Sequence, residues 1–128
     1  MSVPKLLDVD DEPALGGFAA HAGRRAGFDV AIALNATDFA TAFDRAIPDA
    51  VVLDLGMPDG DGHDVLRFLA SRKYDGSVLI ISGFDRPRLE ASRTYGETLG
   101  LQMLSPLSKP VRLAELKSIL AGLRRGST

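Results

Sequence analysis

The chain has 128 residues, a formal net charge of −2 at pH 7 and no cysteine. The length is typical of one domain, and a 25% share of charged residues beside 45% hydrophobic ones argues against wholesale disorder. Without a basic excess we expect no direct binding of nucleic acid. Without cysteine there is no disulfide framework, thiolate zinc site or cysteine nucleophile. The chain has no signal-peptide core and no run of about 18 apolar residues, so we expect a cytoplasmic protein with no membrane insertion.

The first half of the chain alternates short apolar runs with segments of helical period. In chain order these predict a strand at 6–9, a helix from about 13 to 26, a strand at 30–33, a helix that ends before residue 48, and a strand at 50–53. Gly27 is a typical stop for the first helix, and Asn35 or Thr37 can cap the second. The positions predicted to face inward are Leu15, Phe18, Ala19, Ala22 and Ala26 in the first helix and Phe39, Ala42, Phe43 and Ala46 in the second.

The second half continues the alternation. In chain order it predicts a turn-rich segment at 56–62, a helix with Val65, Leu66 and Leu69 inward, a strand at 78–81, a helix from about 86 to 99, a short strand at 101–104 and an amphipathic helix at 113–123. Asp85 can cap the fourth helix and Gly100 can end it. Because that helix has few apolar positions and contains Gly96, we expect it to be the least firmly anchored.

Five successive strand–helix units in a chain of this length predict an α/β fold. The common arrangement is a flavodoxin-like, doubly wound, five-stranded parallel sheet of strand order 2-1-3-4-5 with five helices. We expect residues 1–128 to form a single domain, which a longer protein could carry as its N-terminal part.

Polar side chains follow four of the predicted strands at their carboxyl ends, where ligands bind in such sheets. Asp10 and Asp11 follow the first strand and Asp54 the third, while Ser82 and Lys109 follow the fourth and fifth. Three neighbouring carboxylates repel one another and favour a divalent cation, and an oxygen-only set suits Mg²⁺. An ammonium and a hydroxyl suit phosphoryl oxygens, and a carboxylate beside them can attack phosphorus to form an aspartyl phosphate. Taken singly, each residue is more often a cap, a turn residue or a solvated lysine, so the hypothesis rests on their joint placement.

The same residues lie in motifs that resemble the receiver domain of two-component response regulators, over essentially the whole chain. The matching motifs are Val9-Asp10-Asp11-Glu12, Val52-Leu53-Asp54-Leu55-Gly56-Met57-Pro58, Gly60-Asp61-Gly62, Ile81-Ser82-Gly83 and Ser108-Lys109-Pro110. Each motif is weak by itself, but together they occur in the family's order and spacing.

The resemblance implies that Asp54 accepts a phosphoryl group from a sensor histidine kinase, a phosphotransfer protein or a small acyl phosphate. It implies a Mg²⁺ site formed by Asp10, Asp11, Asp54 and the Gly56 carbonyl. Ser82 and Lys109 would hold the transferred phosphoryl oxygens, and these three residues, Asp54, Ser82 and Lys109, would also hydrolyse the aspartyl phosphate. Such a domain is regulatory, and it would act on an output domain or partner protein through the face of the fourth helix, fifth strand and fifth helix. The chain could also form a homodimer.

The sequence departs from the family at two positions. Pro106 stands where receivers usually carry an aromatic residue that couples to the strand-four hydroxyl, so the usual switch is in doubt. Phe84 or Tyr95 could substitute for it, or the fourth helix and the loop before it could be the moving element. Asp8 points where the family keeps an aliphatic side chain, and a buried carboxyl there must be paired, hydrogen-bonded or neutral. We favour a local accommodation of Asp8 with no role at the site.

Two other function classes remain. One is an interaction module that signals without phosphorylation, to which Pro106 gives some room. The other is a Mg²⁺-dependent phosphatase with an aspartyl intermediate, which is disfavoured because Gly56 stands where those enzymes need a second acid. The segment around the fifth strand also loosely resembles receivers joined to cyclic-di-GMP phosphodiesterase domains. His21 and His63 have no part in the phosphoacceptor scheme.

Overall fold

The computed structural model describes residues 3–11, 17–54, 60–83 and 85–126. Its elements are β1 (Lys5–Asp10), α1 (Phe18–Arg25), β2 (Asp29–Ala33), α2 (Ala36–Arg45), β3 (Ala50–Asp54), α3 (Asp61–Ser71), β4 (Ser77–Ser82), α4 (Arg86–Thr98), β5 (Gln102–Met103), β6 (Leu107–Ser108) and α5 (Leu113–Gly126). None of the helices in these ranges is long and apolar enough to span a membrane. The predicted start of the first helix at about 13 and the predictions for Leu15, Gly56 and Phe84 fall outside the described residues.

The strands form one parallel sheet in the order β2-β1-β3-β4-β5, which confirms the predicted topology. The predicted fifth strand is shorter than expected, because only Gln102–Met103 of 101–104 pairs with β4. A sixth strand, β6, pairs with the far end of β4 through Leu107 and Ser108. Pro106 lies between the two short strands, and a proline without an N–H cannot donate to the ladder there.

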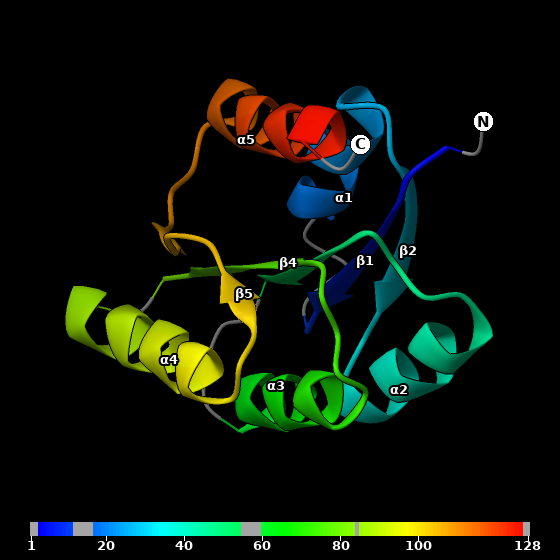
Figure 1. The fold of residues 1–128 in the computed structure, drawn as a ribbon. Coiled ribbons are helices and arrows are strands. Elements are labelled where there is room, and N and C mark those ends of the chain that lie inside the picture. Colours follow the sequence, from blue (N-terminus) through cyan, green and yellow to red (C-terminus); the bar gives the residue numbers. More distant parts are fainter. Residues whose placement is uncertain (1–2, 12–16, 55–59, 84, 127–128) are drawn as a thin grey trace.

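The sheet lies between two layers of helices. Helices α1 and α5 cover one face, and α2, α3 and α4 cover the other (Figure 1). Every residue of β3 is buried, and so is every residue of β4 after its first, as the continuous apolar runs predict for central strands. The cores on the two faces have few polar members, and one of these, Asp8, is a wholly buried carboxyl.

The predicted ends of α1 and α4 are confirmed. Gly27 and Gly100 follow these helices with φ angles of 99° and 92°, the left-handed conformation that suits glycine. At the start of α4 the Asp85 carboxylate accepts a hydrogen bond from the Arg88 backbone N–H at 3.0 Å. The chain is therefore directed out of α4 and back into β5 by its own local sequence.

Helix α2 shows which of the two candidate caps is used, and it corrects the prediction for Ala46. Asn35 is the cap, because its side-chain oxygen accepts a hydrogen bond from the Asp38 N–H at 2.8 Å, whereas Thr37 already lies inside the helix. The prediction that Ala46 faces inward is wrong. The helix ends at Arg45 and the backbone of Ala46 is extended, so its side chain leaves the helical face and is exposed.

Helix α4 is thinly apolar, as predicted, since its buried residues are Leu89, Ser92 and Gly96. The role of Gly96 is different from the expected weakness. A Cβ atom at this position would collide with the sulfur of Met103 in β5, so the glycine allows the helix to lie close against the strand. Gly96 therefore leaves room for the Met103 side chain against α4, while it lowers the intrinsic helix propensity.

Candidate functional site

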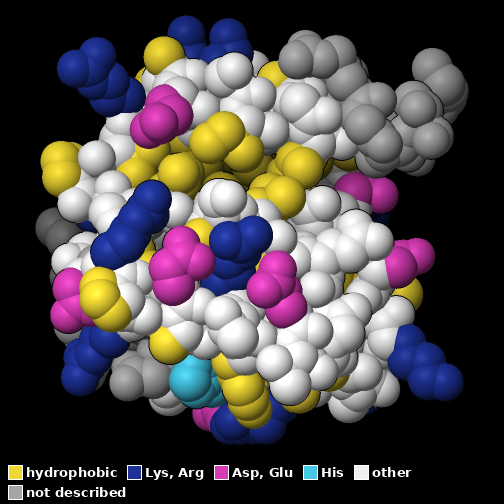
Figure 2. Space-filling view, turned by 60° about the vertical axis from the view of Figure 1, so that its left-hand side comes forward, with side chains coloured by type: hydrophobic (Ala, Val, Ile, Leu, Met, Phe, Trp, Pro, Cys, Tyr) yellow, Lys and Arg dark blue, Asp and Glu magenta, His cyan; other side chains and the backbone are white. Residues whose placement is uncertain are grey.

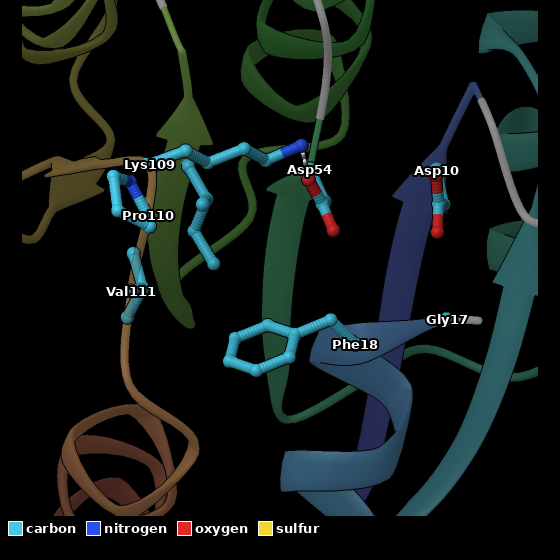
Figure 3. Close-up of a pocket in the computed structure, with 8 residues that line it drawn as sticks. Asp10, Gly17, Phe18, Asp54, Lys109, Pro110 and Val111 are labelled. Carbon is cyan, nitrogen blue, oxygen red and sulfur yellow. Dashed lines mark ion pairs between the residues drawn. The ribbon is translucent and has the colours of Figure 1, made fainter. Parts of the chain in front are cut away.

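Asp10 and Asp54 lie side by side at the carboxyl edge of the sheet. They end β1 and β3, and they are direct neighbours in the register between these strands. Both side chains are buried, with 5% and 4% of their surfaces exposed. Because register partners on neighbouring strands point to the same side of a sheet, both carboxylates lie on one face, on the side where α1 begins (Figure 3).

Lys109 reaches this pair from the segment that follows β6. Its Nζ lies 2.7 Å from Oδ1 of Asp54, and Figure 3 shows the side chain extended across to that carboxylate. The Lys109 backbone N–H donates a hydrogen bond to the Ser82 carbonyl at 2.9 Å, which fixes the base of the side chain against the end of β4. Oδ1 of Asp54 is buried without a well-aligned hydrogen bond from the described residues, so the ammonium is its main compensation.

Burial and pairing act in opposite directions on these two groups. Desolvation raises the pKa of Asp54 above its usual range, and the pairing with Lys109 lowers it only in part. Desolvation works to lower the pKa of Lys109, but the carboxylates of Asp54, Asp10 and Asp11 outweigh it and raise that pKa. The site therefore holds a firmly charged ammonium beside a carboxylate that gains from a further positive charge.

The other predicted site residues are Asp11, Ser82 and Gly56. Asp11 is exposed after β1, yet its charge acts on both Asp54 and Lys109. Ser82 ends β4 as a fully buried residue and is not among the described residues that line the neighbouring cavity. Gly56 lies outside the described residues, so its carbonyl has no placement here.

A cavity of about 480 Å³ opens beside the Asp54–Lys109 pair. Its described lining consists of Asp10, Gly17, Phe18, Asp54, Ile81, Lys109, Pro110 and Val111 (Figure 3). The sequence identified Phe18 only as a core position and gave Val111 no role. Their place beside the phosphoacceptor candidate depends on how the start of α1 faces the start of α5, which a periodic pattern does not encode.

Asp8 lies on the same face as Asp10, one pleat deeper in β1. It has no exposed surface, and neither of its carboxyl oxygens has a hydrogen-bond partner among the described residues. Burial, with the charges of Asp54 and Asp10, raises the pKa of Asp8 to about 8. Of the three expected outcomes, pairing, hydrogen bonding or neutrality, the surroundings favour a neutral carboxyl.

The segment around Pro106 is held by α4. The Arg86 guanidinium donates a hydrogen bond to the Pro106 carbonyl at 3.2 Å, which joins the first turn of α4 to the segment between β5 and β6. Tyr95, one candidate to replace the missing aromatic residue, has its ring 4.6 Å from that of His63 and accepts a hydrogen bond from Arg67 at 3.1 Å. Both contacts are with residues of α3, so the Tyr95 ring packs against α3, and neither contact couples it to β4.

The two histidines lie away from the acid cluster. His21 is exposed on α1. His63 is half-buried between α3 and α4, with a ring nitrogen 3.4 Å from the Ser92 hydroxyl.

The donor chemistry at the carboxyl edge fits a hard divalent cation. Asp10 and Asp54 supply adjacent carboxylates, and Asp11 adds negative charge that acts on Asp54. Among the described residues, no three such side chains are already spaced as a metal-ligand set. Mg²⁺ accommodates that arrangement, because it usually keeps several waters and takes only one or two carboxylates from the protein.

The sequence matches the response regulator receiver domain family over residues 6–121. It is 34% identical over 124 residues to the transcriptional regulatory protein TrcR of Mycobacterium tuberculosis, covering 97% of this chain and 46% of that protein. It is 30% identical over 118 residues to the alkaline phosphatase synthesis transcriptional regulatory protein PhoP of Bacillus subtilis, covering 91% of this chain and 48% of that protein. The chain thus spans about half the length of these curated relatives.

Solved structures agree in fold. A response regulator from Colwellia psychrerythraea superposes with a TM-score of 0.82 at 27% identity, covering 98% of this chain and 99% of that one. The family match spans all the strands and most of the final helix, and the sheet order is that of the CheY-like fold. The chain belongs to the response regulator receiver domain family, the regulatory input module of two-component systems.

Proposed function

We propose that this receiver domain is a phosphorylation-controlled switch in which Asp54 is the phosphoacceptor. The observation that carries the proposal is the buried Asp54 carboxylate with the Lys109 ammonium 2.7 Å from one oxygen and Asp10 beside it in register. A sensor histidine kinase, a phosphotransfer protein or a small acyl phosphate would be the donor. The same site would later hydrolyse the aspartyl phosphate, which limits the lifetime of the signal.

The residues divide the chemistry among them. One Asp54 oxygen forms the new bond to phosphorus while the bond from phosphorus to the donor atom breaks, and the leaving group keeps the electron pair. Lys109 neutralises the phosphoryl oxygens from the β6 side, and the Ser82 hydroxyl would donate to them from β4. No proton has to leave Asp54, because the attacking group is already a carboxylate.

Asp10, Asp11, Asp54 and the Gly56 carbonyl would hold Mg²⁺, partly through water. The cation would offset the repulsion between the acids and draw charge from the phosphoryl oxygens. The raised pKa of Asp54 supports this assignment, because burial and the charges of Asp10 and Asp11 raise it further than Lys109 lowers it.

The output surface would be the face formed by α4, β5 and α5. Figure 2 views this side of the molecule, where hydrophobic side chains gather in a hollowed band with charged side chains of both signs below it. Leu104, Leu107 and Leu123 are partly buried apolar residues on the β5–β6 and α5 segments. On α4, Arg93 pairs with Glu90 and Glu97 at 3.4 and 3.6 Å. An output domain, a partner protein or a second copy of the chain would dock here, and the names of the relatives favour an output in transcription.

The test is phosphorylation by acetyl phosphate with Mg²⁺, followed by intact-mass measurement. We expect an acid-stable, base-labile gain of one phosphoryl group that is lost in Asp54→Asn and without Mg²⁺. Asp29→Asn, an exposed aspartate at the opposite edge of the sheet, is the matched control and should retain the adduct. If wild type gains no phosphoryl group, the phosphoacceptor proposal fails.

That outcome would favour the second candidate, an interaction module independent of phosphorylation. The observation behind it is the Arg86 hydrogen bond to the Pro106 carbonyl, which ties α4 to the segment where an aromatic switch residue is missing. Such a module would bind its partner equally well before and after treatment with acetyl phosphate.

A further inference from the structure

The cavity beside Asp54 is larger than phosphoryl transfer requires. At about 480 Å³ it falls in the range of roughly 300–1,000 Å³ that is typical of small-molecule pockets. A phosphoryl group held between Asp54 and Lys109 would fill only the polar end of it. Among the described residues, none occupies the remaining space, which is therefore open to water or to the rest of the donor.

The walls that the described residues give this remaining space are mostly apolar. Figure 3 shows the Phe18 ring on the α1 side, with Val111 and Pro110 facing it from the segment before α5. Ile81, buried at the end of β4, also lines the space. Lys109 lies at the rim beside the carboxylates of Asp10 and Asp54, so the cavity joins the proposed phosphoacceptor end, where Mg²⁺ would complete the charge balance for a phosphoryl group, to an apolar body.

A ligand that fits this cavity would carry a phosphoryl group at one end and an apolar group at the other. We propose that the cavity binds the acyl group of small acyl phosphates and that Phe18 and Val111 make this domain prefer donors with a longer apolar acyl chain. The inference rests on the proposed phosphoacceptor function and adds the substrate class and the residues that select it. The phosphoryl end of such a donor would lie at Asp54 and Lys109, and its hydrocarbon end would lie between Phe18 and Val111.

The transfer step is balanced without a further reactant. An Asp54 oxygen bonds to phosphorus as the bond from phosphorus to the acyl oxygen breaks, and the acyl group leaves as a carboxylate with the electron pair. The leaving carboxylate stays at the Lys109 end of the cavity, and its chain keeps the apolar contact during transfer. Because that contact exists in the bound donor and in the transition state, it raises the second-order rate constant.

The experiment compares butyryl phosphate with acetyl phosphate as donors to the whole chain with Mg²⁺. Their carboxylate leaving groups are almost equally basic, so chemical reactivity is matched and the two extra methylenes are the variable. A fully buried methylene is worth a factor of about four, so two of them give an expected preference of up to about fifteenfold for butyryl phosphate. The readout is the ratio of second-order rate constants from intact-mass time courses.

Two variants connect the preference to the cavity. Val111→Thr keeps the side-chain shape but places a hydroxyl in the wall, and Phe18→Ala removes the opposite wall. Both should bring the ratio close to one. Ile47→Ala changes an exposed apolar residue at the opposite edge of the sheet, 68% exposed, and should leave the ratio unchanged.

The outcomes separate the two proposals. Equal rate constants for the two donors in wild type, with a normal Asp54 adduct, overturn the donor preference and leave the phosphoacceptor function standing. A preference that survives in both Val111→Thr and Phe18→Ala overturns the assignment to this cavity. No adduct from either donor overturns the phosphoacceptor function and the donor preference together.

Discussion

Replacing Asp8 by valine should make the domain more stable. The side chain is fully buried on the same face as Leu6, and in the sheet register it lies between Ile32 of β2 and Val52 of β3. Both carboxyl oxygens lack a hydrogen-bond partner among the described residues. Valine has nearly the same volume, so Asp8→Val replaces an uncompensated polar group with an apolar one and needs little repacking.

The magnitude follows from the pKa of Asp8, which burial raises to about 8 in the folded domain from 3.8. The folded state binds this proton more tightly than the unfolded chain does, so ionisation opposes folding. The penalty is absent below about pH 4, grows by roughly 1.4 kcal/mol per pH unit between pH 4 and pH 8, and then levels off. At pH 7 it amounts to about 4 kcal/mol, an upper limit for what Asp8→Val recovers from ionisation.

The assay is urea denaturation followed by far-ultraviolet circular dichroism, because the chain contains no tryptophan. Wild type, Asp8→Val and the control Asp29→Asn are compared without Mg²⁺ at pH 5 and pH 8. The advantage of Asp8→Val should be several kcal/mol larger at pH 8 than at pH 5, and Asp29→Asn should follow wild type. An Asp8→Val domain less stable than wild type, or one with an advantage independent of pH, would refute the reasoning. Because we favour a local accommodation of Asp8, Asp8→Val should also still form the Asp54 phosphoryl adduct.

Three further changes test other parts of the structure. Tyr74→Phe removes the buried hydroxyl that donates to the Pro48 carbonyl at 2.9 Å, and should lower the free energy of unfolding by about 1–2 kcal/mol in urea titrations. Gly96→Ala should destabilise by about 1–3 kcal/mol despite its better helix propensity, because the new Cβ meets Met103; a gain in melting temperature would contradict the close approach. Hydrogen exchange with and without a beryllofluoride phosphoryl mimic should change protection across 85–101 if α4 is the moving element, and unchanged protection would exclude it.

Local chemistry made most of the fold predictable. The runs 50–53 and 78–81 are apolar at every position because these strands are covered on both faces, and that pattern survives without knowledge of the partners. Gly27 and Gly100 have backbone angles that few other residues adopt, so their positions mark helix ends directly. Parallel pairing and right-handed crossovers then leave little choice of strand order.

The features that sequence alone did not predict depend on contacts between distant segments. Two short strands, β5 and β6, lie on either side of Pro106. The second of them depends on pairing with the carboxyl end of β4, a contact between distant segments. Gly96 was interpreted as a weakness because helix propensity is a local quantity, whereas its contact with Met103 is tertiary. Ala46 fits a helical stripe that the helix ends too early to use.

The candidate site also has a part that the sequence predicts and a part that it does not. Strand ends identified Asp10, Asp54 and Lys109 as neighbours, since the carboxyl ends of parallel strands share one edge. The apolar walls from Phe18 and Val111 were not identifiable, because each residue fits an ordinary packing position in its own segment. The closeness of Asp54 and Lys109 was thus predictable from the sequence, but the apolar walls of the neighbouring cavity were not.

The net charge of −2 conceals how the acids at this edge would be balanced. With the pKa of Asp8 raised to about 8, that carboxyl is mostly neutral at pH 7 and contributes little charge. Ionised Asp10, Asp11 and Asp54 would then face the one ammonium that the described residues bring to them, that of Lys109, which leaves an excess of two negative charges. A divalent cation neutralises that excess, whereas an ionised Asp8 would leave it one charge short. With Asp8 buried and protonated, the proposed Mg²⁺ would balance Asp10, Asp11 and Asp54 together with Lys109, and Asp8 would add no charge of its own.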